Sequence, residues 1–192
     1  MCFGALLLMG TVSSQTAQAE LKFSLKFGTS GSTDSGLNNP TNILVSSDGK
    51  TIYVVDTGNN RINAFEKSGT HDFNFGSFCD TASIGDCNDN ARGADSDGDG
   101  QFNNPNGVSI DSANDLLYVA DTDNNRIQII DVGNEGKFDS KFGSSGSADG
   151  KLNSPEGLAL DTTKDLLYVA ETGNNRIQVF DVDNNGSFKL KF

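Results

Sequence analysis

Apolar residues recur along this chain in short runs that are separated by clusters of Gly, Asn, Asp and Ser. The last group contains four runs: GLALD at 157–161, LLYVAE at 166–171, RIQVFD at 176–181 and SFKLKF at 187–192. Three of these alternate apolar and polar residues, which predicts β-strands with one covered face. The run at 166–171 is apolar at nearly every position, which predicts a strand covered on both faces. Nothing in the chain has the period of an amphipathic helix.

The middle of this pattern occurs three times, as IYVVDTGNNRINAF (52–65), LYVADTDNNRIQII (117–130) and LYVAETGNNRIQVF (167–180). The matching tyrosines, Tyr53, Tyr118 and Tyr168, are 65 and 50 residues apart. Repetition of this kind indicates a repeat architecture. Four-stranded antiparallel units stacked face to face would cover both faces of their inner strands, so the pattern predicts an all-β fold of the β-propeller type.

The repeated string, the PEGLALD segment at 155–161 and the connector KFDSKFG at 137–143 resemble the NHL repeat, and the resemblance covers essentially all of residues 21–192. It implies a β-propeller of four-stranded antiparallel blades, usually six-bladed. We therefore expect a domain spanning 20–192 with blades at about 28–76, 77–143 and 144–192. The resemblance also implies a binding scaffold more often than an enzyme.

Three blades make half of a six-bladed ring, and half a ring leaves an apolar blade face uncovered at each end. Two explanations remain open: the chain is a fragment of a longer protein, which we favour, or two chains close a ring by self-association. The segment LKFSLKFG at 21–28 matches the end of a blade, so the domain opens, as it closes, on a fourth strand.

The first 19 residues have the features of a signal peptide. An apolar stretch, CFGALLLMGTV, precedes a polar segment that ends in Ala17-Gln18-Ala19, a small-x-small cleavage site. No Lys or Arg precedes the apolar stretch, and a buried N-terminal strand or helix is the alternative. We expect a secreted or extracytoplasmic protein, at the cell surface or in the periplasm, in which Cys79 and Cys87 pair as a disulfide.

The charge balance restricts the partners. With 14 basic and 26 acidic residues the formal net charge is −12, which argues against a nucleic-acid partner because such binders need clustered Lys and Arg. No apolar run is long enough to cross a bilayer, so no membrane insertion is expected after signal cleavage. We expect a protein or glycan ligand on one face of the propeller.

An acidic and a basic residue flank the turn in each repeat. The pairs are Asp56 with Arg61, Asp121 with Arg126, and Glu171 with Arg176. Four intervening residues suit a tight hairpin that brings the two charges opposite each other. The pairs would either line a binding surface or serve as structural ion pairs; their presence in every copy favours the structural role. The Asn-Asn dipeptides between them are expected to hold the turns.

The second repeat carries an inserted acidic loop at about 77–98. Five aspartates and one arginine give it a net charge of −4. Asp95, Asp97 and Asp99 form a DxDxDG pattern, the first half of an EF-hand-type calcium loop. The second half fails, because Asn106 stands where a bidentate Glu is expected. Asp99 also aligns with Asp149 of the next repeat. A weak calcium site and a solvated acidic loop are thus both open; no other cofactor is expected.

Enzyme motifs are scarce. The single histidine, His71, has no accompanying nucleophile motif, and no catalytic residue is assigned. We expect a non-catalytic binding or interaction scaffold built from NHL repeats. The alternative is a propeller-type lyase or lactonase, of which this chain would form a partial ring.

Overall fold

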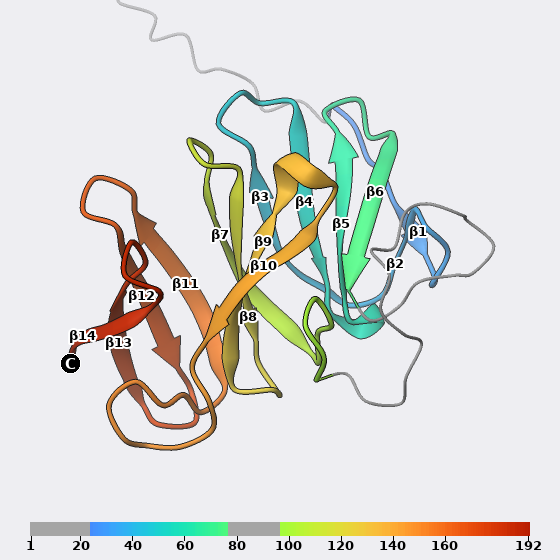
Figure 1. Ribbon diagram of the computed structural model, residues 1–192. Helices are drawn as coiled ribbons and strands as arrows, with labels where there is room; N and C mark the ends of the chain where they lie inside the picture. Colours follow the sequence, from blue (N-terminus) through green and yellow to red (C-terminus); the bar gives the residue numbers. More distant parts are fainter. Residues whose placement is uncertain (1–23, 77–96) are drawn as a thin grey trace, which may run out of the picture.

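The computed structural model describes residues 24–76 and 97–192, which form three four-stranded antiparallel sheets standing side by side (Figure 1). Each sheet is one propeller-type blade. Blade 1 contains β3 (Pro40–Val45), β4 (Thr51–Asp56), β5 (Arg61–Glu66) and β6 (His71–Gly76). Blade 2 contains β7 (Pro105–Asp111), β8 (Leu116–Asp121), β9 (Arg126–Asp131) and β10 (Lys137–Phe142). Blade 3 contains β11 (Pro155–Asp161), β12 (Leu166–Glu171), β13 (Arg176–Asp181) and β14 (Ser187–Lys191).

Each blade is a simple meander in which every strand pairs with its neighbour in sequence. The expected all-β fold is confirmed, and the inner strands β4, β8 and β12 begin and end where the apolar pattern predicts. The first strand of each blade begins earlier than expected, at a proline, and a register irregularity follows that proline. Proline suits the first position of a strand because its missing N–H is not needed by the ladder there.

Small elements complete the described residues. A parallel pair, β1 (Thr29–Ser30) with β2 (Gly36–Leu37), precedes blade 1, and the bridge between Ser145 and Leu152 repeats it ahead of blade 3. The two short 3-10 turns are η1 (Thr57–Asn59) and η2 (Val132–Asn134). Nowhere in 24–76 or 97–192 is there a helix long and apolar enough to cross a membrane.

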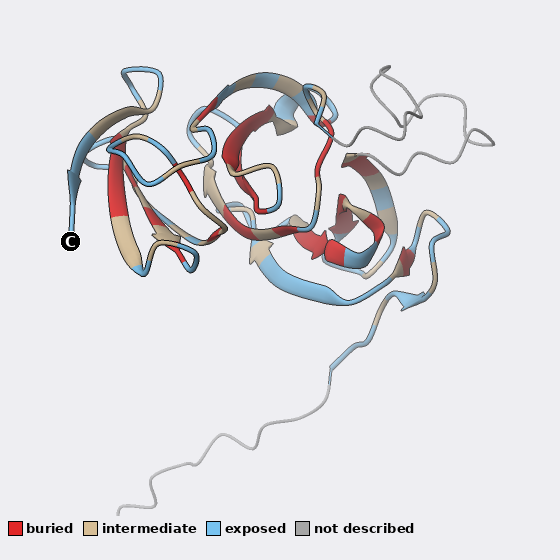
Figure 2. Ribbon diagram, turned by 90° about the horizontal axis from the view of Figure 1, so that it is seen from below, coloured by how far each residue is buried: buried red, intermediate tan, exposed pale blue. Residues whose placement is uncertain are grey.

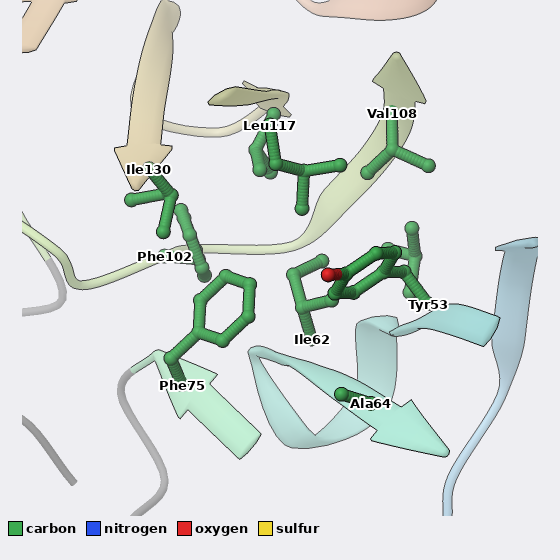
Figure 3. Close-up of a cluster of buried hydrophobic side chains, with 10 residues drawn as sticks. Tyr53, Ile62, Ala64, Phe75, Phe102, Val108, Leu117 and Ile130 are labelled. Carbon is green, nitrogen blue, oxygen red and sulfur yellow. The ribbon is translucent and has the colours of Figure 1, made fainter. Parts of the chain in front are cut away.

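The hydrophobic core lies between blades rather than within one of them (Figure 3). Between blades 1 and 2, Tyr53 and Phe75 pack against Val108, Leu117 and Ile130. The same arrangement joins blades 2 and 3, where the rings of Phe142 and Phe180 lie 4.9 Å apart. Burial on both faces explains why the second strand of each repeat is apolar throughout.

Polar contacts reinforce both interfaces. Thr57 Oγ1 donates to the carbonyl of Pro105 at 2.7 Å, and Thr122 Oγ1 donates to the carbonyl of Pro155 at 2.8 Å. The side-chain oxygens of two turn asparagines accept from the backbone of the following blade, in the pairs Asn60 with Asn104 and Asn125 with Ser154. Each turn therefore fixes the first strand of the next blade.

The outer sides of the array are open. Figure 2 shows buried residues on the inner strands and exposed ones on the strand that leads to the C-terminus. In β3 the side chains of Ile43 and Val45 are 59% and 52% exposed, and Phe192, just after β14, is 68% exposed. Phe192 occupies the position in blade 3 that Phe142 occupies in blade 2.

This difference yields a stability prediction. Phe142→Ala removes a ring packed between two blades, so the free energy of unfolding should fall by about 3–5 kcal/mol. Phe192→Ala, the matched control, should change it by less than about 0.5 kcal/mol because its ring is mostly solvated. Urea unfolding followed by circular dichroism measures both. Equal effects of the two substitutions would contradict the described interface.

Candidate functional site

A buried carboxylate stands at the end of the second strand in each blade, directly opposite an arginine. The arginine Nε donates to a carboxylate oxygen at 2.8 Å in the Asp56–Arg61 pair, 2.6 Å in Asp121–Arg126 and 2.7 Å in Glu171–Arg176. The carboxylates are 0%, 0% and 2% exposed in the same order. We call each group, with its polar contacts, a carboxylate hub.

Blade 3 shows the contacts of a hub in full. Glu171 accepts from the backbone N–H of Asn153 at 2.9 Å and from the Asn174 side chain at 2.6 Å. It also accepts from the side chains of Arg176 and Gln178, both at 2.7 Å. A buried carboxylate loses the hydration that stabilises its charge, and these donors replace it. The hub thus ties the entry loop, the turn and the third strand to one anion.

Blades 1 and 2 repeat these contacts. Asp56 accepts from the Asn38 backbone and from the side chains of Asn59, Arg61 and Asn63. In blade 2 the Asp121 donors are the Asn103 backbone and the side chains of Asn124, Arg126 and Gln128.

The arginine of each hub donates its other N–H groups to backbone carbonyls of the loop that enters the blade. Arg176 donates to the carbonyls of Ser147, Ala148 and Lys151 at 2.6, 3.1 and 2.8 Å. The equivalent acceptors of Arg126 are the carbonyls of Asp97, Gly98 and Gln101; those of Arg61 are the carbonyls of Thr33 and Gly36. The ion pairs therefore connect a turn to an entry loop, with the guanidinium engaged by backbone oxygens.

The hub of blade 1 differs from the other two in one side chain, which is shorter by one methylene group. Gln128 and Gln178 each accept a backbone N–H through Oε1, from Gly100 and Gly150 respectively, both at 2.9 Å. Blade 1 has the shorter Asn63 at this position, and its buried Oδ1 has no hydrogen-bond partner among residues 24–76 and 97–192. The shorter side chain leaves one acceptor unsatisfied, which costs folding free energy.

Two hub carboxyls have shifted pKa values, in opposite directions. Burial raises the pKa of Asp121 and outweighs the hydrogen bonds from Asn103, Asn124 and Arg126. At Glu171 burial also acts to raise the pKa, but the hydrogen bonds from Arg176, Asn174 and Gln178 prevail and hold the pKa below its ordinary value. Asp121 lies between two blades, whereas Glu171 borders the open side of blade 3.

The turns that carry the hubs all lie at one end of the blades, which we call the turn face. The residues flanking the inserted segment lie at this same end. Gly76 pairs in register with Arg61, and the Asp97 carbonyl accepts from Arg126 at 2.6 Å. The described residues on either side of segment 77–96 therefore lie on the turn face. Cys79, Cys87 and Asp95, like the proposed signal peptide, lie outside the described residues.

The carboxylate of Asp99 forms a surface ion pair with Lys141, and Asp149 pairs in the same way with Lys191. Asp99 thus has a role that repeats between blades, as its alignment with Asp149 suggests. Within the described ranges no three His, Cys, Asp or Glu side chains are grouped to hold a metal ion. Calcium binding stays a prediction that depends on Asp95 and Asp97.

Sequence reasoning missed the residues that join the blades. Thr57 and Thr122 bond to the next blade, as do Asn60 and Asn125, whose left-handed backbone (φ 55° and 52°) fits the expected turn role. Their recurrence in each copy was a signal, but the string shows only that they sit in a turn. The direction in which a turn side chain reaches depends on the neighbouring blade.

Comparison with known proteins places these features in a family context. The NHL repeat model matches residues 102–130 and 152–180. A 45-residue stretch is 51% identical to the Drosophila melanogaster protein brain tumor; it covers 23% of this chain and 4% of that protein.

The solved structures that resemble this one share its fold at low identity. Kuenenia stuttgartiensis hydrazine synthase matches with a TM-score of 0.58 and 16% identity, over 88% of this chain and 39% of that chain. A protein of unknown function from Desulfotomaculum acetoxidans matches with a TM-score of 0.55 and 15% identity, over 81% of this chain and 43% of that chain. The periplasmic gluconolactonase of Pseudomonas aeruginosa matches with a TM-score of 0.52 and 13% identity, over 80% of this chain and 38% of that chain. The chain spans about two-fifths of the length of these structures.

The unsatisfied oxygen of Asn63 leads to a paired prediction. Asn63→Gln should raise the free energy of unfolding by about 1 kcal/mol, because the longer side chain would give its oxygen the reach that Gln128 and Gln178 use to accept a backbone N–H. Gln128→Asn should lower it by about 1–3 kcal/mol by creating the same defect in blade 2. Chemical denaturation measures the free energy of unfolding of both variants. A destabilised Asn63→Gln protein would show that blade 1 lacks room for glutamine.

The lowered pKa of Glu171 makes its contribution depend on pH. A carboxyl whose pKa is depressed by folding stabilises the native state above its unfolded pKa, here 4.5, and loses that effect as the pH falls through its lower folded value. Glu171→Gln should therefore cost about 1–3 kcal/mol at pH 7 and clearly less at pH 3. Urea unfolding of both proteins at each pH tests this. A difference independent of pH would exclude the ionised carboxylate as the cause.

Proposed function

Since this chain is an NHL-repeat protein with propeller-type blades, we propose that it is a non-catalytic scaffold that binds a protein ligand on its turn face. NHL repeats are generally protein-interaction modules, which supports a protein as the ligand. Binding experiments with glycans and with proteins distinguish this proposal from the alternative, a glycan ligand.

The main support comes from where the repeated charged residues lie and what they contact. The acid and the arginine that recur in every repeat lie in the hubs, where they form hydrogen bonds with the backbone, so they hold the frame. At the tip of the turn, blade 2 carries Asp123 where blades 1 and 3 carry Gly58 and Gly173. A rigid frame that presents loops at regular intervals is the usual construction of a binding surface.

The charge of the turn face suggests the chemistry of the ligand. Asp97 and Asp123 are exposed there. The segment 77–96 contains four aspartates and one arginine, and the described residues on either side of it, Gly76 and Asp97, lie on this face. Complementary charge guides association and selects partners. The ligand we propose is therefore a protein with a basic surface or segment.

The remaining proposals concern the compartment. The signal-like start supports export, and an oxidising compartment would allow Cys79 and Cys87 to form a disulfide. Coordination of calcium by Asp95 and Asp97 would reduce the negative charge of the inserted loop and so would act on the same face.

A propeller-type lyase or lactonase is the second candidate, and the fold shared with a gluconolactonase is compatible with it. Such an enzyme would need a bound metal or a catalytic group in addition to the hubs. Metal analysis of the purified protein, together with lactone hydrolysis assays in the presence of divalent cations, distinguishes the two functions. Stoichiometric metal and turnover would favour the enzyme.

The binding proposal predicts which charge reversal matters. Ligands selected from a peptide library displayed against the protein should be basic, and Asp123→Lys should weaken their binding about tenfold, since a charge at the rim of an interface acts on association. Asp183→Lys makes the same charge change in the β13–β14 turn, at the opposite end of the blade, and should leave binding unchanged. Titration by fluorescence anisotropy at low and high salt measures both. Ligands without basic residues, or equal losses in the two variants, would contradict the proposal.

A further inference from the structure

Blades 2 and 3 each contain an ion pair that blade 1 cannot form. Lys141 pairs with Asp99 in blade 2, and Lys191 pairs with Asp149 in blade 3. Each lysine lies in the fourth strand of its blade, and each aspartate lies in the loop that enters the blade. In blade 1 the lysine position is occupied by Asn74, so the ammonium group has no counterpart there.

The register of the strands identifies Asn74 as the counterpart of the lysines. In blade 2 Lys141 lies opposite Gln128, and blade 3 has the same pair of residue types in the same register. In blade 1 Asn74 lies opposite Asn63, which takes the place of the glutamine. Side chains at directly opposed positions point to the same face of a sheet. Both side chains of this pair are therefore shorter in blade 1 than in the other blades.

The aspartate of the ion pair does have a counterpart in blade 1, which is Asp34. Counting back from the proline that begins each blade, Asp34 aligns with Asp99. Its loop is held as in blade 2, because Arg61 donates to the carbonyls of Thr33 and Gly36 at 2.7 Å each. The arginine of blade 2 likewise donates to carbonyls on both sides of Asp99. The Asp34 carboxylate therefore faces the strand position that a lysine occupies in the other blades.

A buried acceptor lies beside this position. Asn63 is fully buried, and its Nδ2 donates to the Asp56 carboxylate at 3.1 Å and to the carbonyl of Gly36 at 3.2 Å. Its Oδ1 accepts no hydrogen bond from the part of the chain that the structure describes. Asn74, directly opposite, is 2% exposed. A buried polar atom of this kind is unfavourable unless a ligand satisfies it.

The oxygen atoms at this place suit a cation. Asp34 supplies a carboxylate, and Asn63 and Asn74 can each present an amide oxygen. Carboxylate and amide oxygens are the ligands that hard cations take in proteins. A carboxylate has about four acceptor positions, so Asp34 can hold a cation beside its other contacts. Ser35, next to Asp34, is exposed and leaves a path from solvent.

The other two blades indicate the charge of the cation. There the same place holds one ammonium and one carboxylate, which balance each other. One positive charge gives blade 1 the same balance, whereas a divalent ion would leave a positive charge in excess beside a single carboxylate. The place is also more enclosed in blade 1, since the side chains of Lys141 and Lys191 are 43% and 48% exposed. Enclosure reduces screening and strengthens the attraction between ion and carboxylate.

We propose that Asp34, Asn63 and Asn74 bind a monovalent metal cation, sodium or potassium, in blade 1. The ion takes the role that the lysine ammonium has in blades 2 and 3. The Asp34 carboxylate and the Oδ1 of Asn63 coordinate it, and Asn74 turns its amide oxygen toward it. The site needs no ligand on the turn face, so it stands apart from the proposed scaffold function.

Stability in different chloride salts measures the binding. In about 0.2 M sodium or potassium chloride the unfolding equilibrium constant should be about fivefold lower than in choline chloride at the same concentration, because an ion that binds only the folded state stabilises it. Choline is too large to lie between the opposed side chains. A chelator removes calcium, so that the inserted loop does not contribute. Equal unfolding constants in the three salts would overturn the proposal.

Asn74→Lys separates this site from general salt effects. The lysine of the other blades shows that the position accepts this side chain, and its ammonium should pair with Asp34 and replace the ion. The unfolding constant of this variant should become independent of the cation. Thr162→Lys makes the same charge change at an exposed position of blade 3 and should keep the wild-type dependence. If Asn74→Lys keeps it as well, the site is wrong.

Anomalous X-ray scattering locates the ion without relying on a variant. Wild-type crystals grown in rubidium chloride should show an anomalous peak within coordination distance of the Asn63 Oδ1 and the Asp34 carboxylate. Crystals of the Asn74→Lys protein should show none there. Density that a water molecule explains, without an anomalous signal, would overturn the proposal even if the stability depends on the salt.

Discussion

The bond between a buried carboxylate and an arginine at the base of each turn is the contact on which the architecture depends. An anion removed from water has to be surrounded by donors, and in every blade these come from the strand end, the turn and the entry loop. The arginine in turn donates hydrogen bonds to carbonyls of the entry loop and so holds that loop in place. Segments with little apolar surface are thereby held in place by charge, which allows a chain rich in Gly, Asn and Asp to have ordered loops.

Contacts between blades extend this local order along the array. The turn that a hub holds is the turn whose Thr and Asn bind the next blade, so a correctly formed hub positions its neighbour. The apolar faces then close over the interface, as Figure 3 shows for blades 1 and 2. A blade is thus stabilised mainly by its neighbours, in the manner of repeat proteins. This explains why the outer sides of blades 1 and 3 expose apolar surface of a kind that blade 2 buries on both sides.

The sequence was sufficient to predict the strands, because each alternating run is bounded by residues that break regular structure. It also placed the acid and arginine opposite each other, since four residues between them leave room only for a tight turn. It could not show that the Asp56 carboxylate accepts a backbone N–H from Asn38, because that contact depends on how the entry loop folds back. Nor could it separate Asn63 from Gln128, whose difference matters only where a backbone N–H lies one methylene further away.

Blade 2 carries Phe102 and Ile130 where blade 3 carries Leu152 and Phe180, and blade 1 Leu37 and Phe65. The aromatic ring and the aliphatic side chain have exchanged positions, so each blade contains one of each at this pair of sites. The repeat thus preserves the combined volume rather than the identity of either residue. Changing one member alone would leave a cavity or force an overlap. Two apparent mismatches between repeats are therefore a single compensated exchange.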